Sequence, residues 1–213
     1  MKNYSDDSKR YRMYKMLKNL PRNIKEQFQY DDEAVWSFTD LDIGRNLCRR
    51  LLQLPGITTE SLITDATASV GGNTITFAEY FDHVTSIELN ADRFRMLNAN
   101  IQLIGNADKI TTKQGYAQDE IPAYQDIVFF DPPWGADYKK HSKMTIDIKD
   151  PNGNDQPIED FILSVNTKYF VVKLPQNYDI VHMERAVQSK YKCIYKEWHG
   201  KPNSSIVIIF GPI

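Results

Sequence analysis

The feature that most constrains the fold is a regular alternation of short apolar segments with helical ones. The strands that the apolar segments predict span residues 61–66, 84–89, 110–114, 126–130, 169–173, 192–198 and 205–210. The helices between them are expected at residues 72–81, 91–103, 158–165 and 180–189. Strands separated by helices imply crossover units and a mostly parallel sheet covered on both faces. We therefore expect an α/β fold in which the last two strands form an antiparallel pair.

A helical arm is expected before this alternation. Four apolar residues recur at helical spacing over residues 8–20: Tyr11, Tyr14, Leu17 and Leu20. A polar connector is expected at 21–33, and Asp40 is a candidate cap for a second helix. We predict an arm over residues 1–55, which packs on the core and contributes to the substrate site, and a core over residues 56–213.

Composition limits the partners. The formal net charge of −2 argues against broad nucleic-acid binding by phosphate neutralisation alone. The first 25 residues are nevertheless basic, with Lys2, Lys9, Arg10, Arg12, Lys15, Lys18, Arg22 and Lys25. Such a face could hold a short run of phosphates or could be a solvated helix face. The chain has no run of about 18 apolar residues and no signal-peptide core at its start, so we expect an intracellular protein without a membrane partner.

Metal chemistry is not indicated. Cys48 and Cys193 are far apart in sequence, and neither they nor the four histidines show the spacing of metal ligands. We expect no metal and buried free thiols in a reducing compartment.

Three segments fall at the carboxyl ends of predicted strands, where open α/β sheets bind ligands. The first is 65–74, which contains Gly71 and Gly72; these two glycines would let the backbone approach a ligand closely. The second is Glu88, 23 residues after Asp65, near the offset at which an acid grips ribose hydroxyls. Taken alone, Glu88 is better explained as an exposed helix-capping acid at the start of the helix expected at 91–103. The third is the turn at 131–134, and the convergence of the three predicts a nucleoside-type site.

That turn, Asp131-Pro132-Pro133-Trp134, suits chemistry on an exocyclic amino group. The Asp131 carboxylate and the Pro132 carbonyl can both accept hydrogen bonds from an NH2 group, and the prolines carry no competing N–H. The prolines also stiffen the turn, so the acceptors are aimed in advance. Trp134 can cover the base; a rigid surface turn is the simpler alternative.

From about Arg10 to Phe210 the chain resembles the trimethylguanosine synthases, the cap guanine-N2 methyltransferases of the class I S-adenosylmethionine-dependent superfamily. The motifs that carry the resemblance include Trp36-Ser37-Phe38-Thr39, Val70-Gly71-Gly72-Asn73-Thr74, Pro132-Pro133-Trp134-Gly135 and Leu174-Pro175-Gln176-Asn177. The resemblance implies a Rossmann-like class I methyltransferase fold with a mostly parallel seven-stranded sheet and a small helical N-terminal extension. It also implies S-adenosylmethionine as cofactor, 7-methylguanosine-capped RNA as partner and a monomer.

The resemblance also implies roles for individual residues. Positions that match the cofactor site are Asp65, Ser69, Gly71, Asn73, Glu88, Tyr116 and Asp131. Asp131 and Pro132 match the positions that hold the guanine amino group, and Trp134 matches the tryptophan that stacks on the base. Trp36 and Asn177 match further substrate positions; Trp36 could also be core packing. Gln176 replaces an arginine expected to bind the cap phosphates, and Lys18, Arg22 or Lys25 could substitute for it.

Further departures from the family keep alternatives open. Asp131 stands where the cap enzymes have serine, and Asp-Pro-Pro-Trp is the form favoured by adenine-N6 methyltransferases. Ser69 replaces a glycine and Tyr116 an acid, for which Gln118 or Asp119 could substitute. The alternatives to cap methylation are therefore methylation of adenine N6 or of an internal guanine, and a degenerate RNA-binding subunit without activity.

Overall fold

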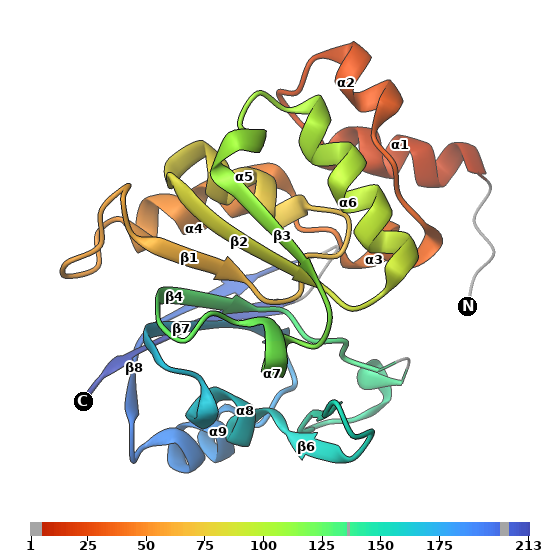
Figure 1. Ribbon diagram of the computed structural model, residues 1–213. Coiled ribbons are helices and arrows are strands. Elements are labelled where there is room, and N and C mark those ends of the chain that lie inside the picture. The colour runs from red at the N-terminus through yellow and green to blue at the C-terminus, as the bar shows by residue number, and fades with distance from the viewer. Residues whose placement is uncertain (1–5, 136, 201–204) are drawn as a thin grey trace. The chain divides into compact units, whose positions relative to one another are not determined.

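The computed structural model describes residues 6–135, 137–200 and 205–213 (Figure 1). Its internal contacts divide it into two compact units: unit 1, Met1–Gly115, and unit 2, Tyr116–Ile213. The expected boundary between arm and core at residue 55 remains a prediction.

Unit 1 is built around three parallel strands in the order β3-β2-β1. They are β1 (Leu62–Asp65), β2 (His83–Glu88) and β3 (Ile110–Gln114). Helix α5 (Gly72–Tyr80) packs on β1 and β2, and α6 (Ala91–Leu103) packs on β2 and β3. Helix α6 begins after Asn90 because that side chain accepts hydrogen bonds from the N–H groups of Asp92 and Arg93. The predicted strands and helices of this region are confirmed, with small shifts at their ends.

The arm contains four helices: α1 (Asp6–Met16), α2 (Arg22–Gln27), α3 (Asp32–Ser37) and α4 (Leu41–Leu51). The predicted Asp40 cap is confirmed, since its side chain accepts a hydrogen bond from Asp42 N. The apolar stripe predicted for the first helix is wrong at Tyr11, which is 63% exposed. Leu17 of the predicted stripe is buried, together with Met13 and Met16, which lie four and one positions before it on the same face.

The polar connector expected at residues 21–33 is also wrong, because α2 lies within it and α3 begins near its end. Asp31 caps α3 by accepting a hydrogen bond from Ala34 N. The arm's buried side chains, among them Leu17 and Phe38, form one cluster with Val70 and Ile75 of the following segment. Apolar burial against that segment therefore stabilises the short arm helices, which would be marginal alone.

Unit 2 contains four long strands in the order β4-β7-β9-β8. They are β4 (Gln125–Phe130), β7 (Thr167–Pro175), β8 (Tyr191–His199) and β9 (Ser205–Pro212). Strand β4 pairs with β7 in parallel, whereas β7, β9 and β8 pair antiparallel, as expected for the terminal pair. The helices are α7 (Ala117–Glu120), α8 (Ile158–Ser164) and α9 (Ile180–Val187). Phe170 packs edge to face on Phe130 and on Phe161 in the core between β4, β7 and α8, and the rings of Phe130 and Phe161 are tilted at 54°.

The polar segment after the Pro-Pro turn contains regular secondary structure. It contains a short 3-10 turn, η2 (Tyr138–Lys140), and a hairpin of β5 (Asp147–Lys149) and β6 (Asp155–Pro157). Asp150 fixes the hairpin turn by accepting hydrogen bonds from the N–H groups of Asn152 and Asn154.

Candidate functional site

The loop between β1 and α5 in unit 1 holds two left-handed residues, Ser69 (φ 49°) and Gly71 (φ 104°). Gly71 suits this conformation because a side chain would be strained there, and an added Cβ would lie 3.1 Å from Leu97 Cδ1. The loop is tied to β2, since Ala68 N donates to Ile87 O and Ser69 N donates to Glu88 Oε2. The sequence therefore builds a loop with a fixed conformation at the end of β1.

Gly72 has a packing role that the sequence did not suggest. An added Cβ would come within 3.1–3.2 Å of three ring atoms of Phe38. Gly72 thus makes room for an arm side chain, and its close approach to a ligand stays a prediction. This couples the start of α5 to the segment after α3.

Glu88 is buried and accepts two backbone hydrogen bonds, from Ser69 N to Oε2 and from Asn90 N to Oε1, both at 2.8 Å. Burial raises the pKa of this carboxyl, while the two backbone N–H groups act in the opposite direction. Each carboxylate oxygen has a second lone pair, so the group can still accept from vicinal hydroxyls. Glu88 therefore stabilises the loop through these hydrogen bonds and is also a candidate ligand for the ribose hydroxyls.

Asp65 and Asn73 lie in the same part of unit 1. The fully buried Asp65 accepts a 2.8 Å hydrogen bond from Thr74 Oγ1, which in turn accepts from Ser86 Oγ. Asn73 Oδ1 is buried and has no hydrogen-bond partner among the described residues. A buried amide oxygen in that state favours a ligand donor such as an ammonium group.

In unit 2 the Asp131 carboxylate follows the end of β4 and forms an ion pair with Lys173 of β7. The Oδ2–Nζ distance is 2.6 Å, and the side chains are 12% and 6% exposed respectively. Burial raises the pKa of the Asp131 carboxyl; the Lys173 ammonium and the Trp134 N–H act in the opposite direction. Asp131 is therefore a nearly buried acceptor with a fixed orientation.

Trp134 is partly exposed, as a base-stacking ring must be. Its ring makes an edge contact with Tyr138, with the centroids 5.2 Å apart, and Lys173 Nζ lies 5.6 Å from the indole centroid. The indole N–H is near the Asp131 carboxylate but not in hydrogen-bond geometry, and Nε1 is a buried polar atom without a partner in the described part of the chain. Pro132 is buried and Pro133 is exposed. Asp131, Pro132 and Trp134 thus lie in one turn, with the indole N–H near the Asp131 carboxylate.

The other substrate candidates have different contacts. Asn177 donates from Nδ2 to the carbonyls of Tyr138 and His141, both at 2.7 Å, so it holds the segment after Trp134. Lys18 is exposed and lies 3.5 and 3.4 Å from the carboxylates of Asp40 and Asp42, which raise its pKa.

Trp36 is 42% exposed on α3, and the Arg12 guanidinium lies 4.8 Å from its ring centroid. It is therefore a surface ring rather than core packing. Tyr116 precedes α7 and is partly exposed, whereas Gln118 donates to Lys149 O and Gln156 Oε1. The amide of Gln118 is thus engaged by the β5–β6 hairpin.

Sequence reasoning missed Lys173. A lysine inside the apolar run Phe170-Val171-Val172-Lys173-Leu174 was the available signal, because lysine is rarely buried unless paired. Gln176, at the position of the expected arginine, donates to His199 O at 3.0 Å.

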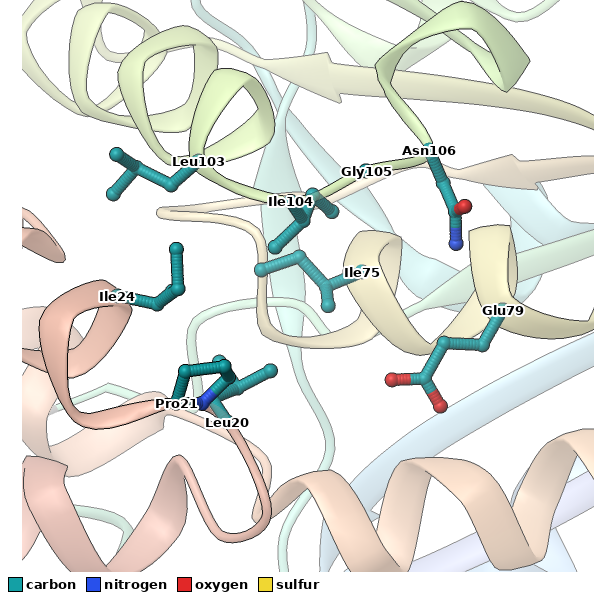
Figure 2. Close-up of a pocket in the computed structure, with 9 residues that line it drawn as sticks. All are labelled: Leu20, Pro21, Ile24, Ile75, Glu79, Leu103, Ile104, Gly105 and Asn106. Carbon is teal, nitrogen blue, oxygen red and sulfur yellow. The ribbon is translucent and has the colours of Figure 1, made fainter.

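A separate cavity of about 290 Å³ lies in unit 1 near the end of α6 (Figure 2). Ile24, Ile75, Leu103 and Ile104 give it an apolar lining, and Glu79 at its side is paired with Arg45. None of the candidate site residues lines it. In the ranges that the structure describes, no three His, Cys, Asp or Glu side chains are grouped to hold a metal ion, and no helix is long and apolar enough to cross a membrane.

Comparison with known proteins identifies relatives. The sequence profile of a family described as RNA cap guanine-N2 methyltransferase matches residues 60–212, more than two thirds of the chain. An uncharacterised protein of Acanthamoeba polyphaga mimivirus is 37% identical over 122 residues, 55% of this chain and 47% of that protein. Trimethylguanosine synthase of Schizosaccharomyces pombe is 26% identical over 203 residues, 88% of this chain and 79% of that protein. The Saccharomyces cerevisiae enzyme of that name is 29% identical over 65% of this chain and 48% of its own length. The chain thus spans about half the length of two of these relatives.

Solved structures support the fold. Magnesium protoporphyrin IX methyltransferase from Synechocystis with bound S-adenosylmethionine has a TM-score of 0.64 at 8% identity, over 98% of this chain and 92% of that one. A tRNA methyltransferase from M. jannaschii has a TM-score of 0.54 at 11% identity, over 87% and 51%. The predicted Rossmann-like methyltransferase fold is confirmed.

Proposed function

The chain belongs to the RNA cap guanine-N2 methyltransferase family, and we propose that it transfers methyl from S-adenosylmethionine to the N2 amine of a 7-methylguanosine RNA cap. The observation that carries the proposal is the turn after β4. There a buried, oriented carboxylate and a proline carbonyl adjoin a partly exposed indole. These are the two acceptors and the stacking surface that a planar base with an exocyclic amino group requires.

The residues of unit 1 fit the cofactor. Asn73 Oδ1, buried without a partner among the described residues, suits the ammonium group of the methionine part. The remaining lone pairs of Glu88 suit the ribose hydroxyls, and the left-handed Gly71 keeps the loop free of a side chain. When bound, S-adenosylmethionine supplies an electrophilic methyl group and leaves as the neutral thioether.

The chain's residues orient the acceptor. We expect Asp131 and the Pro132 carbonyl to accept hydrogen bonds from the two amino hydrogens, which fixes the direction of the nitrogen lone pair. The new N–C bond forms as the C–S bond breaks, and the excess proton on nitrogen passes to Asp131 or to water. Trp134 would hold the base plane. Positioning and electrostatics, rather than a covalent step, supply the rate enhancement.

Methylation of adenine N6 is the second candidate, and Asp131 favours it, because the Asp-Pro-Pro-Trp form resembles adenine-N6 enzymes. The paired Lys173 also matters here, since an Asp131–Lys173 pair carries no net charge and gives a cationic base little advantage beyond cation–π stacking.

Methyl transfer from labelled S-adenosylmethionine to a panel of acceptors tests the proposal. The panel contains a 7-methylguanosine cap dinucleotide, uncapped RNA of matched sequence and adenine-containing DNA, with Asp131→Ala as the blank. Label in the cap dinucleotide supports cap methylation; label only in uncapped RNA or DNA rejects it. If no acceptor is labelled and calorimetry detects no S-adenosylmethionine binding, the chain is not a methyltransferase.

A further inference from the structure

Four basic residues lie within five positions after the candidate base-binding turn. We call residues 139–143 the lysine loop; it contains Lys139, Lys140, His141, Ser142 and Lys143. All five are exposed. The chain as a whole has a net charge of −2, so this is a local concentration of positive charge and not part of a generally basic surface.

The lysine loop is held in one conformation by the segment after β7. Asn177 Nδ2 donates to the carbonyls of Tyr138 and His141 at 2.7 Å. Just beyond the loop, Met144 N donates to Asn177 O, and Asp179 N donates to Met144 O. Backbone order of this kind presents the lysines at a fixed place on unit 2, which lowers the ordering cost of binding.

The lysine loop is also continuous with the stacking surface. The Tyr138 ring contacts the edge of Trp134, and Lys139 Nζ lies 5.3 Å from the Tyr138 ring centroid. The lysine loop therefore begins beside the ring on which we propose that the base stacks.

The acids nearby leave the lysines available. Lys140 pairs with Asp137 at 2.6 Å and Lys143 with Asp179 at 2.7 Å. Both lysine side chains remain more than 60% exposed, at 73% and 64%. Exposed pairs of this kind are weak, because solvent and salt screen them, so a phosphate can compete for the ammonium groups.

We propose that the lysine loop binds phosphate groups of the substrate nucleic acid. The proposal rests on the proposed function, because it assumes a nucleotide stacked at Trp134. The phosphates could belong to the triphosphate bridge of a cap or to the following RNA chain. Lysine suits either, since it contacts phosphate as a point charge on a flexible stem.

The test compares two triple variants. The first is Lys139→Ser, Lys140→Ser, Lys143→Ser. The matched control is Lys149→Ser, Lys192→Ser, Lys196→Ser, which also removes three exposed unit 2 lysines, two of them paired with acids. Affinities are measured by fluorescence titration for 7-methylguanosine, the cap dinucleotide, capped RNA and uncapped RNA of the same sequence. The salt range is about 50 to 200 mM.

The lysine-loop variant should lose about tenfold in affinity for capped RNA, and the slope of log affinity against log salt should become about two units shallower. Its affinity for the nucleoside should not change. If the affinity for the cap dinucleotide falls as much as the affinity for capped RNA, the lysines contact the triphosphate bridge. If the affinity falls only for the two RNAs, the lysines contact the phosphates of the RNA chain. If the lysine-loop and control variants bind every ligand equally, the proposal is wrong. Equal binding of capped and uncapped RNA by the unmodified protein counts against the cap proposal. In that case the affinities of the two triple variants for uncapped RNA still show whether the lysine loop binds phosphate.

Discussion

Nζ of Lys173 lies 2.6 Å from Oδ2 of Asp131, and both side chains are nearly buried. A nearly buried carboxylate without a cation would favour its protonated form, which is a poorer acceptor for an amino group. Lys173 opposes that effect and fixes the direction of the carboxylate. The pair therefore explains how an aspartate can stand at the end of β4 and still accept hydrogen bonds from a substrate amine.

Replacing Lys173 with methionine should move the acid limb of the kcat–pH profile upward. Burial already raises the pKa of Asp131, and loss of the Lys173 ammonium should raise it further. As the pH is lowered, Asp131 of the variant would become protonated at a higher pH than in the unmodified protein, and the activity that depends on its ionised form would be lost there. The variant should also lose about 3–5 kcal/mol of stability at neutral pH, because one charge is left without its partner.

The double variant Asp131→Asn, Lys173→Met is the control for that experiment. It should recover much of the lost stability, because no buried charge remains, but it should not recover activity. An unchanged pH profile in the single variant would show that Lys173 does not act on Asp131.

Trp134→Ala should weaken binding of the 7-methylguanosine cap dinucleotide by about tenfold, because stacking and cation–π attraction are both lost. Trp134→Phe should keep most of the stacking and lose mainly the preference for the cationic base over unmethylated guanine. Fluorescence or calorimetric titration with both dinucleotides measures this ratio. If the Trp134→Ala protein binds the cap dinucleotide as tightly as the unmodified protein does, Trp134 is not part of the base-binding site.

Glu88→Gln should weaken S-adenosylmethionine binding and should change the pH dependence of stability. Burial raises the pKa of Glu88 above its unfolded value, so the folded state binds that proton more tightly. The contribution of this group to stability is therefore present at low pH and is lost as the pH rises through the raised pKa. Urea unfolding across this range should show the unmodified protein losing stability relative to Glu88→Gln as the pH increases. A constant difference between the two would contradict the assignment.

Gly71→Ala should destabilise the protein by about 1–3 kcal/mol, because its φ of 104° is left-handed and the new Cβ would crowd Leu97. Gly105→Ala is the matched control, since an added Cβ there meets nothing within 4 Å. Urea midpoints distinguish them, and equal midpoints would argue against strain in the loop after β1.

Much of the fold followed from local patterns. The apolar pattern predicted a helix at residues 91–103, which are its observed bounds, and the structure shows that Asn90 caps it. Tyr11 was misplaced because two apolar stripes overlap in the first helix, and only packing against Val70 and Ile75 decides which one is buried. The site was harder to predict. Asp131 and Trp134 belong to the same short turn of the sequence. Lys173 lies 42 positions after Asp131 and reaches it only because β7 pairs with β4. The roles proposed for Trp36, Lys18 and Tyr116 remain predictions.

Identification of the methylated nucleoside is the most direct test of the central claim. The cap dinucleotide is incubated with the protein and S-adenosylmethionine, digested, and analysed by mass spectrometry against synthetic standards, with Asp131→Ala in parallel. The account predicts a methyl group on N2 of 7-methylguanosine, formed by the unmodified protein and absent with Asp131→Ala. A methyl group on adenine N6, or an equal yield from the Asp131→Ala protein, would contradict it.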